Sequence, residues 1–411
     1  MIAFRIRQTV DFLEGVNLIF FVKKTNSLPL KIYPPILKTI EMFIYKSLNK
    51  RIVKNVLGLL FFAFGFSSFV YAQKINGLSF GGPSEAYYTL EMFEDLKTSN
   101  ATWVAIIPET TLDRSTLKLV PDEENIYWGA TIAATIEFTK LAKQADLKVF
   151  LKPHIFLGKK VDKKESPKVV FTKNASSTNK EFSTDKTRGA EWRGDLILKN
   201  ENDWTILETE YEAYILKLAK VADSLEVDLF SVGTELKQFA IKRPLFWKQL
   251  IQKVRTIYTG PLTYAANWDE YNKLSFWQDL DYIGVDTYFP INKMKTPSLK
   301  KTLKNWKSIQ KQLRKFSRKE NRKILLTEFG YRNISYAGKR PWTHDKGEIH
   351  TPNYQAQVNL YEAFFQTFWN KSWVAGGFSW RWFSHTLSDK DTSFSVQGKP
   401  ALAILQKWYK K

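Results

Sequence analysis

Eight apolar, strand-like runs alternate with longer helical patterns between residues 73 and 411, and this alternation limits the possible folds more than any other feature. The runs cover residues 75–80, 103–107, 148–154, 228–233, 262–266, 282–287, 323–327 and 374–379. Helical patterns lie near residues 84–98, 129–145, 205–225, 243–258, 300–323, 353–369 and 401–409. Repeated strand–helix units are typical of parallel sheets covered by helices, and eight such strands in this order predict a single (β/α)8 barrel, a TIM barrel with enlarged βα loops.

An open, doubly wound sheet is the main alternative fold. Such sheets normally carry a glycine-rich phosphate-binding turn after the first strand. The first predicted strand here ends in Phe80-Gly-Gly-Pro, which is not a turn of that kind. No linker, low-complexity tract or internal repeat divides residues 73–411. We therefore expect these residues to form one domain.

Polar and aromatic side chains stand where the predicted strands end. In a TIM barrel the active site lies at the carboxyl ends of the strands, so we expect these side chains to converge. They are Glu109, Lys152, His154, Thr234, Glu235, Asn267, Trp268, Asp269, Asp286, Tyr288, Glu328, Trp380 and Trp382. The sequence shows no Ser-His-Asp set, no His-Glu-x-x-His helix and no dinucleotide-binding turn.

Two of these residues, Glu235 and Glu328, follow apolar strands that both end in Thr-Glu. Hydrolysis of a glycosidic bond requires one carboxylic acid that protonates the leaving oxygen and one carboxylate that attacks the anomeric carbon or activates water. We assign Glu235 as the acid/base and Glu328 as the nucleophile, because the charge of Glu328 would help to keep Glu235 protonated. The competing interpretation is that each glutamate only pairs with a neighbouring lysine or arginine.

The motifs around the two glutamates resemble those of clan A retaining glycoside hydrolases, and most closely those of glycoside hydrolase family 113. The matching stretches are Gly-Thr-Glu235, Thr-Glu328-Phe-Gly-Tyr and Gly-Gly-Phe-Ser-Trp380-Arg-Trp, and the resemblance covers most of residues 73–411. Characterised members of this family are mainly β-mannanases. The resemblance implies a retaining enzyme that acts on β-1,4-mannosidic bonds of mannan, glucomannan or manno-oligosaccharides, with Glu235 as acid/base and Glu328 as nucleophile.

Eight further residues are candidates for contacts with the sugar. Trp380 is a candidate platform under the sugar at the cleavage point, and Tyr288 can hold Glu328 ionised through a hydrogen bond. Most of the clan has asparagine before the acid/base, bound to the sugar 2-hydroxyl, where this chain has Thr234, so this position bears on specificity. The remaining candidates are His154, Asn267, Trp268, Trp192 and Arg193. Packing or an ordinary structural hydrogen bond is the competing interpretation for each of them.

We expect no metal and no organic cofactor, because hydrolysis by two carboxylates needs neither. The expected substrate is a polysaccharide or an oligosaccharide. Two alternative functions stay open on the sequence alone. One is a clan A glycosidase of other specificity, acting on a β-glucan or from chain ends. The other is a barrel that binds carbohydrate without turning it over, although the presence of both carboxylates argues against it.

Residues 51–72 have the pattern of a secretory signal peptide. A basic flank at Lys50–Lys54 precedes the apolar residues 56–70, which are too few for a comfortable membrane span of about 20 residues. We therefore expect export to a periplasm or to the medium, with no stable membrane span after cleavage. An uncleaved anchor is the alternative. Residues 1–50 form a poorly defined extension, and Met42 is an alternative start.

The formal net charge of +21 invites comparison with nucleic-acid-binding proteins. Lysines are densest in residues 159–164 and 300–323. In the second stretch Leu303, Trp306, Ile309 and Leu313 recur at helical spacing. This pattern predicts a surface helix with a basic, solvated face, and no nucleic-acid-binding motif accompanies it. We expect no nucleic-acid partner and a monomer. The chain has no cysteine, which excludes disulfides, thiolate metal sites and cysteine nucleophiles.

Overall fold

The computed structural model describes residues 73–120, 127–158, 169–171, 192–343 and 351–410. The expected signal peptide, the N-terminal extension and Met42 lie outside the described residues. Residues 73–411 form one compact unit. None of the described helices is long and apolar enough to cross a membrane.

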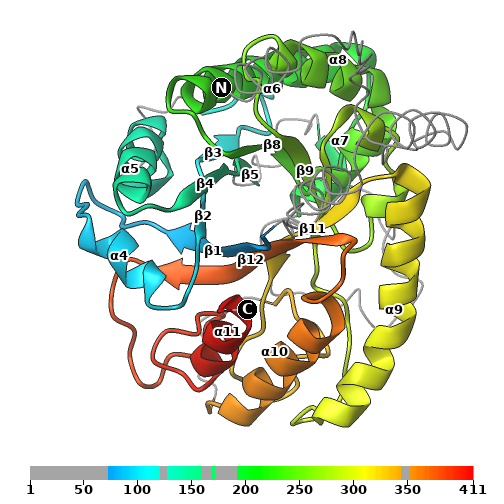
Figure 1. Cartoon of the computed structure of the whole chain (residues 1–411). Coiled ribbons are helices and arrows are strands. Elements are labelled where there is room, and N and C mark those ends of the chain that lie inside the picture. The colour runs from blue at the N-terminus through cyan, green and yellow to red at the C-terminus, as the bar shows by residue number, and fades with distance from the viewer. Residues whose placement is uncertain (1–72, 121–126, 159–168, 172–191, 344–350, 411) are drawn as a thin grey trace, which may run out of the picture. The chain divides into compact units, whose positions relative to one another are not determined.

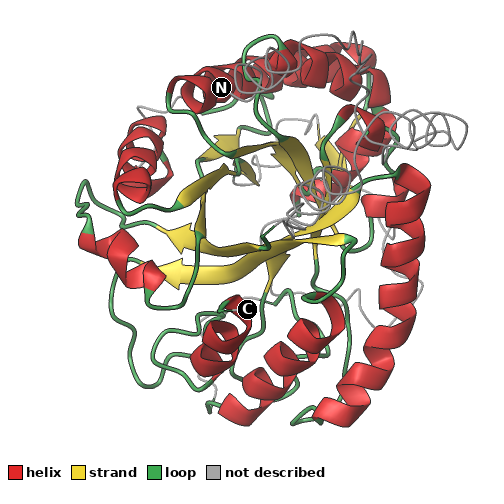
Figure 2. Cartoon of the chain, viewed as in Figure 1, coloured by secondary structure: helices red, strands yellow, loops and turns green. Residues whose placement is uncertain are grey.

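Eight parallel strands close into a barrel, which confirms the predicted (β/α)8 fold. They are β1 (Ile75–Gly81), β2 (Trp103–Ile106), β4 (Lys148–Leu151), β8 (Leu229–Thr234), β9 (Leu262–Asn267), β10 (Tyr282–Asp286), β11 (Lys323–Phe329) and β12 (Val374–Phe383). Their order around the barrel is β1, β12, β11, β10, β9, β8, β4 and β2. Figures 1 and 2 show the strands at the centre, with the helices arranged around them.

The described α-helices follow the strands in sequence. They are α4 (Glu91–Lys97), α5 (Ile132–Gln144), α6 (Glu201–Ser224), α7 (Lys237–Lys242), α8 (Pro244–Arg255), α9 (Leu299–Glu320), α10 (Tyr354–Phe368) and α11 (Ala401–Tyr409). The connection from β9 to β10 holds two short 3-10 turns, η5 (Tyr271–Lys273) and η6 (Trp277–Asp279), in place of an α-helix.

Side-chain caps explain where several helices begin. Thr131, Asn200 and Asn353 each accept a hydrogen bond from the backbone N–H three residues later, at the starts of α5, α6 and α10. Such a cap satisfies one of the N–H groups that the first turn of a helix leaves unpaired. Helix α9 ends at Asn321, whose φ of 49° is left-handed, a conformation that asparagine adopts more readily than most residues.

Helix α4 is shorter than the pattern over residues 84–98 predicts, because it begins only at Glu91. Residues 84–86 form bends instead, and residues 87–89 have no regular secondary structure. Tyr88 leaves the helical path and stacks on Trp128, with ring centroids 5.1 Å apart and planes 7° from parallel. This packing against a distant segment overrides the local helical preference.

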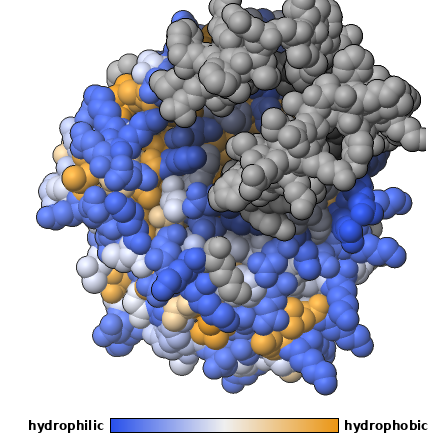
Figure 3. Space-filling view, in the orientation of Figure 1, coloured by the Kyte–Doolittle hydropathy of each residue, from blue (hydrophilic) through white to orange (hydrophobic). Residues whose placement is uncertain are grey.

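Helix α9 carries the basic face that its sequence predicts. Trp306 and Leu313 are fully buried, and Leu303 and Ile309 pack against the same core. The basic residues on the helix are all exposed: Lys300, Lys301, Lys304, Lys307, Lys311, Arg314, Lys315, Arg318 and Lys319. The face of the molecule in Figure 3 is mostly hydrophilic where described residues are visible, with small and separate apolar patches.

The barrel interior is filled by side chains. Ile75, Ala105, Phe150, Leu229, Leu325 and Phe378 form a buried cluster there. Gly77 makes room for this packing, since a Cβ at that position would lie 2.2 Å from the Phe378 ring. A filled interior is the usual state of such barrels, so a ligand is bound at the rim and not inside the barrel.

Additional short strands extend the rim beside β2 and β4. Strand β3 (Glu109–Leu112) pairs in parallel with β5 (His154–Leu157), and β6 (Val169–Phe171) pairs with β7 (Leu196–Leu198) in antiparallel fashion. A 3-10 turn, η4 (Arg193–Asp195), leads into β7. Strand β3 follows β2 and β5 follows β4, so their pairing continues the wall of the barrel past its carboxyl end. Strands β5, β6 and β7 and the turn η4 are the described elements of the long excursion after β4.

The barrel closes where β1 meets β12, which lie side by side in Figure 1. Ile75 pairs with Gly376, and Gly376 has a φ of 134° that strongly favours glycine. Helix α11 supports the same place. The Asn76 side chain donates to the Tyr409 carbonyl at 2.8 Å, and the Tyr409 hydroxyl donates to the Gly77 carbonyl at 2.6 Å.

Candidate active site

The two predicted catalytic glutamates lie on one rim of the barrel. Glu328 is part of β11, where it is aligned with Asp286 on β10, and Glu235 directly follows β8. Glu235 has a left-handed φ of 54°, and its N–H donates to the Ala265 carbonyl on β9 at 2.8 Å. A left-handed turn is uncommon for glutamate, and such turns concentrate at functional sites.

Three side chains contact the Glu328 carboxylate, which is 5% exposed. The Lys152 ammonium donates to Oε1 of Glu328, and the Tyr288 hydroxyl donates to Oε2 at 2.8 Å. The Nε2 atom of His154 lies 3.5 Å from Oε1. Burial by itself would raise the pKa of Glu328, but Lys152 and His154 outweigh burial and hold this pKa below its usual range. Glu328 is therefore ionised, as a nucleophile has to be.

His154 is neutral in this environment. Burial, together with the charges of Lys152 and Arg193, lowers its pKa to about 3. The imidazole therefore carries no charge at neutral pH and can offer a hydrogen bond or a flat face to a ligand. Its ring is stacked on Trp380, with centroids 5.9 Å apart and planes 9° from parallel.

Glu235 has a different environment. Burial raises its pKa, with a further contribution from the charge of Glu328, while Arg193 opposes both. Arg193 Nη2 lies 3.0 Å from Oε2 of Glu235, and Trp192 Nε1 donates to the same oxygen at 3.4 Å. Two neighbouring carboxyl groups with pKa values shifted in opposite directions match the needs of a general acid and a nucleophile.

A buried network supports the turn that holds Glu235. The next residue, Leu236, donates its N–H to the Tyr264 hydroxyl at 2.7 Å, and that hydroxyl donates to Oε1 of Glu270 at 3.0 Å. Glu270 is fully buried, and burial together with the charge of Glu235 raises its pKa well above the usual range. These hydrogen bonds anchor the turn to β9, and they are present without a bound ligand.

Aromatic rings line the rim near Glu328. The Lys152 ammonium lies over the Trp380 ring, 5.2 Å from its centroid. Trp268 stacks on Trp342 with centroids 5.8 Å apart, and both pack against the cluster that contains Tyr288 and Trp380. The peptide bond after Trp380 is cis. Flat apolar surfaces beside a pair of carboxyl groups suit a sugar ring, which has a C–H face and a hydroxyl edge.

The sequence profile of Glycoside Hydrolase Family 113 matches residues 83–399. The chain belongs to this family. No curated protein sequence matches the chain. The barrel, the paired glutamates and the family membership together show a glycoside hydrolase.

Several solved structures share the fold of this family 113 chain. One is the GH113 β-mannanase AaManA from Alicyclobacillus acidocaldarius in complex with ManMIm, which is 20% identical, with 82% of this chain and 97% of that chain covered and a TM-score of 0.67. A GH113 β-1,4-mannanase solved as a complex is 22% identical, with 82% and 99% covered and a TM-score of 0.62. A β-glucuronidase from Ruminococcus gnavus is 14% identical, with 82% and 50% covered and a TM-score of 0.52.

Two predicted sugar contacts of the family 113 chain, Thr234 and Asn267, make no hydrogen bond to either catalytic glutamate among the described residues. The Thr234 hydroxyl is buried and has no hydrogen-bond partner among the described residues. Asn267 is half-buried and donates to Asp269 at 3.0 Å, and the buried Lys237 donates to the same carboxylate at 2.5 Å. Thr234 therefore keeps its hydrogen-bonding capacity, whereas one N–H of the Asn267 amide is already bonded to Asp269.

The structure adds contacts to the site that sequence reasoning did not predict. Lys152 was expected on the rim but had no assigned role. It precedes His154 by two residues, and side chains two apart in an extended segment share a face, so this spacing was an available signal for its contact with Glu328. Trp342 and the Tyr264–Glu270 pair had no such signal, because their contacts join segments that are far apart in the sequence.

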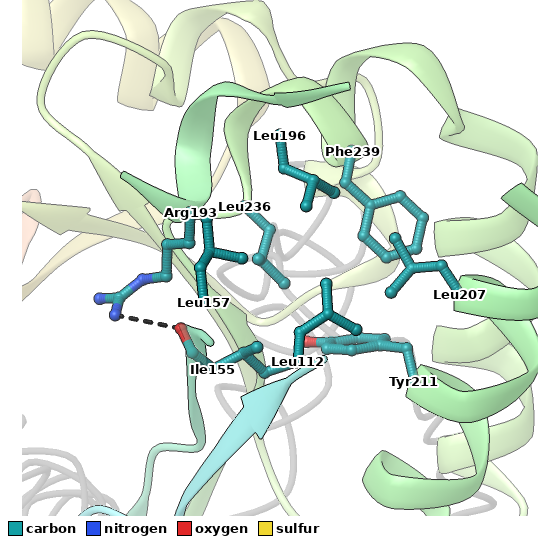
Figure 4. A pocket seen from close by; sticks show the side chains of 9 residues that line it. All are labelled: Leu112, Ile155, Leu157, Arg193, Leu196, Leu207, Tyr211, Leu236 and Phe239. Atoms are coloured by element: carbon teal, nitrogen blue, oxygen red, sulfur yellow. Dashed lines mark hydrogen bonds between the residues drawn. The ribbon is translucent and has the colours of Figure 1, made fainter. Parts of the chain in front are cut away.

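A small apolar cavity lies behind Arg193 (Figure 4). Its lining residues are Leu112, Ile155, Leu157, Arg193, Leu196, Leu207, Tyr211, Leu236 and Phe239. The cavity holds about 10 Å³, which is room for one water molecule at most. Figure 4 shows the guanidinium of Arg193 turned away from these apolar side chains, toward the Ile155 carbonyl.

Proposed function

We propose that this glycoside hydrolase cleaves β-1,4-mannosidic bonds in mannan-type polysaccharides or manno-oligosaccharides and retains the anomeric configuration. The observation that carries the proposal is a pair of glutamates whose pKa values are shifted in opposite directions. Glu328 is held ionised by Lys152 and His154 and accepts a hydrogen bond from Tyr288, whereas Glu235 is buried and its pKa is raised. The family membership and the likeness to two solved β-mannanases support the choice of sugar.

In the first step, Glu328 attacks the anomeric carbon while Glu235 gives its proton to the leaving oxygen. The bond between the sugar and the leaving group breaks, and a covalent glycosyl ester forms on Glu328. Lys152 and Tyr288 hold the attacking carboxylate in place before the reaction, so little reorganisation is needed when the bond forms.

In the second step, Glu235 acts as a base. It takes a proton from water, the water oxygen attacks the anomeric carbon, and the ester to Glu328 breaks. Glu235 must therefore change between its neutral and ionised forms in each cycle. Burial favours the neutral form and Arg193 favours the ionised form, so both forms are within reach at this position.

The first test is sugar release by residues 73–411 from mannan, glucomannan, cellulose and xylan, alongside the variant Glu328→Gln. We expect release from mannan and glucomannan, and loss of that release in the variant. Cleavage of cellulose or xylan in preference to mannan, again lost in the variant, would keep the mechanism and reject the sugar. Absence of release from every glycan would reject the catalytic function.

A second test addresses stereochemistry. Proton NMR of the newly formed reducing end, recorded within minutes of mixing with manno-oligosaccharide, is expected to show the β-anomer first. Initial appearance of the α-anomer would contradict the retaining mechanism. Addition of azide to Glu235→Ala is expected to restore turnover of a substrate with a good leaving group and to yield a β-glycosyl azide, because azide needs no general base.

We also propose that the protein is exported, on the strength of the basic flank and apolar run in residues 51–72. The test is N-terminal sequencing of the protein recovered from the periplasm or the medium of expressing cells. A mature end near Gln73 is expected. An end well before Gln73 would reject cleavage at this point.

A further inference from the structure

Phe156 is an exposed aromatic residue beside the catalytic pair. It lies on β5 two residues after His154, and 45% of its surface is accessible. The two rings are neighbours, with centroids 6.4 Å apart. His154 in turn stacks on Trp380. A row of rings therefore runs from the buried Trp380 near Glu328 outward to Phe156, although neither the family membership nor the catalytic steps assign Phe156 a role.

Arg193 connects Phe156 to the acid/base. Its guanidinium lies over the Phe156 ring, 5.6 Å from the centroid, and pairs with Glu235 at 3.0 Å. The Arg193 side chain is 12% exposed, and that of Glu235 is 14% exposed. One flat aromatic face and one hydrogen-bond donor thus lie together on the Glu235 side of the site.

We propose that Phe156 and Arg193 form the binding site for the sugar ring on the leaving-group side of the cleaved bond, and that this sugar draws Arg193 away from Glu235. The ligand class is a neutral pyranose unit of the substrate chain. This inference rests on the proposed hydrolysis of a glycan by Glu235 and Glu328.

The side of the bond follows from the chemistry. The acid donates its proton to the leaving oxygen, so the group beyond that oxygen lies next to Glu235. Lys152, His154 and Tyr288 contact Glu328, so they lie beside the sugar that becomes attached to the nucleophile. Arg193 and Trp192 contact Glu235, and Phe156 packs against Arg193, so this side of the site is left for the sugar that departs.

The chemistry of the two side chains suits a neutral sugar. The C–H groups on one face of a pyranose can pack on the Phe156 ring, and sugar hydroxyls can accept hydrogen bonds from the guanidinium. The apolar cavity behind Arg193 is not an alternative site, because its volume of about 10 Å³ cannot hold a sugar.

Binding at this site has a consequence for protonation. Arg193 stabilises the ionised form of Glu235, which is the wrong form for the first step. A sugar hydroxyl that competes for the guanidinium weakens this pair. The acid then becomes protonated more readily when the leaving-group sugar is in place, so binding energy from that sugar contributes to the chemical step.

The first experiment compares two substrates in Phe156→Ala. A manno-oligosaccharide places a sugar in the proposed site, whereas a β-mannosyl fluoride has a leaving group that fills no such site and needs no proton. We expect kcat/KM for the oligosaccharide to fall about tenfold, the size of one lost aromatic contact. We expect the value for the fluoride to stay unchanged. Phe156→Trp is expected to keep most of the oligosaccharide activity.

The matched control is Leu245→Ala, which truncates an apolar side chain that is 74% exposed on helix α8. This variant is expected to leave kcat/KM unchanged for both substrates. Equal losses on both substrates in Phe156→Ala would show a structural role and overturn the proposal, and so would no loss on either. If the wild type prefers another glycan, the proposed sugar specificity fails, and the same comparison with that glycan and its glycosyl fluoride still tests the site.

The second experiment tests the role of Arg193 through pH profiles. The basic limb of kcat/KM reports Glu235 in the free enzyme, and the basic limb of kcat reports it in the substrate complex. We expect the kcat limb of the wild type to lie at higher pH for the oligosaccharide. In Arg193→Gln the kcat/KM limb is expected to move up, so that the two limbs coincide. Coincident limbs in the wild type would overturn the coupling.

Discussion

At the scale of single residues, one buried lysine sets the charge state of the nucleophile. Lys152 is fully buried, donates to Glu328 and lies over the Trp380 ring. A buried carboxylate without such a partner would bind a proton at neutral pH. The amine therefore allows a carboxylate to stay ionised in a site from which water is largely excluded.

Lys152→Met is expected to move the acid limb of kcat/KM to higher pH by about one unit or more, because loss of the cation raises the pKa of Glu328. Below the shifted pKa the nucleophile is protonated and inactive. A pH–rate profile measures the shift. The control is Lys399→Met, which removes another buried lysine paired with a carboxylate, Asp391, at 2.6 Å. An unchanged acid limb in Lys152→Met would contradict the assignment.

The Tyr264 hydroxyl supports the turn at Glu235, and Tyr264→Phe is expected to cost about 1–3 kcal/mol of stability by leaving the Leu236 N–H unpaired. We expect kcat to fall more than KM rises, because the acid loses its position. Tyr258→Phe is the control, since its buried hydroxyl donates to the Val227 carbonyl at 2.7 Å. Denaturant unfolding and steady-state kinetics distinguish the two variants. Equal kinetics in both would reject a positioning role.

The sequence indicates the two catalytic glutamates more clearly than it indicates the residues that surround them. Glu235 and Glu328 stand at strand ends in a repeated pattern, so local sequence is enough to place them on one rim. The contact between Phe156 and Arg193 depends on how the excursion after β4 returns to the barrel, and no local pattern encodes that return. Arg193 could be named as a candidate from the sequence, but its contacts with Phe156 and Glu235 are visible only in the structure.

At the scale of elements, the buried face of helix α9 contributes most of what this helix adds to the stability of the fold. Trp306 is fully buried against the rings of Phe289, Phe364 and Phe368, while the basic side chains of the helix are exposed. Burial of apolar surface stabilises a helix in a protein more than its intrinsic propensity does. The two faces of α9 therefore contribute very differently to the fold.

Trp306→Ala is expected to reduce the free energy of unfolding by about 3–5 kcal/mol, since it removes a large buried side chain and leaves a cavity. Lys307→Ala, on the exposed face of the same helix, is expected to change it by about 0.5 kcal/mol or less. Urea unfolding measures both values. Similar values for the two variants would contradict the packing of α9.

Strand positions agree with the sequence more closely than helix positions do. The predicted run at residues 282–287 is observed as Tyr282–Asp286, whereas the helix expected over residues 84–98 begins only at Glu91. A buried strand is marked by a continuous apolar run, which tertiary contacts reinforce. The stacking of Tyr88 on Trp128 takes the chain out of a helix by means of a residue 40 positions away.

At the scale of the whole molecule, closure of the barrel depends on its last helix. Trp408 and Tyr409 of α11 are buried, and the Tyr409 ring stacks on Trp369 with centroids 5.3 Å apart. The Tyr409 hydroxyl also donates a hydrogen bond to the Gly77 carbonyl on β1, and the Tyr409 carbonyl accepts one from the Asn76 side chain. Helix α11 thus secures the place where the first and last strands meet.

Removal of residues 401–411 is expected to lower the melting temperature sharply, because each buried aromatic side chain lost costs about 3–5 kcal/mol. Removal of residues 410–411 alone, which spares these aromatics, is expected to leave the melting temperature unchanged. Circular dichroism on heating compares the two truncated chains with the full chain. Equal melting temperatures in all three would contradict the role of α11.

The pairing of β1 with β12 also sets the point during synthesis at which the barrel can close. Ile75 leaves the ribosome long before its partner Gly376 is made. Until then the sheet is open, and both of its edges carry unpaired N–H and C=O groups. A chain that stalls before residue 374 offers these edges to other nascent chains, and aggregation competes with folding. Closure of this barrel therefore has to wait until its last strand has been made.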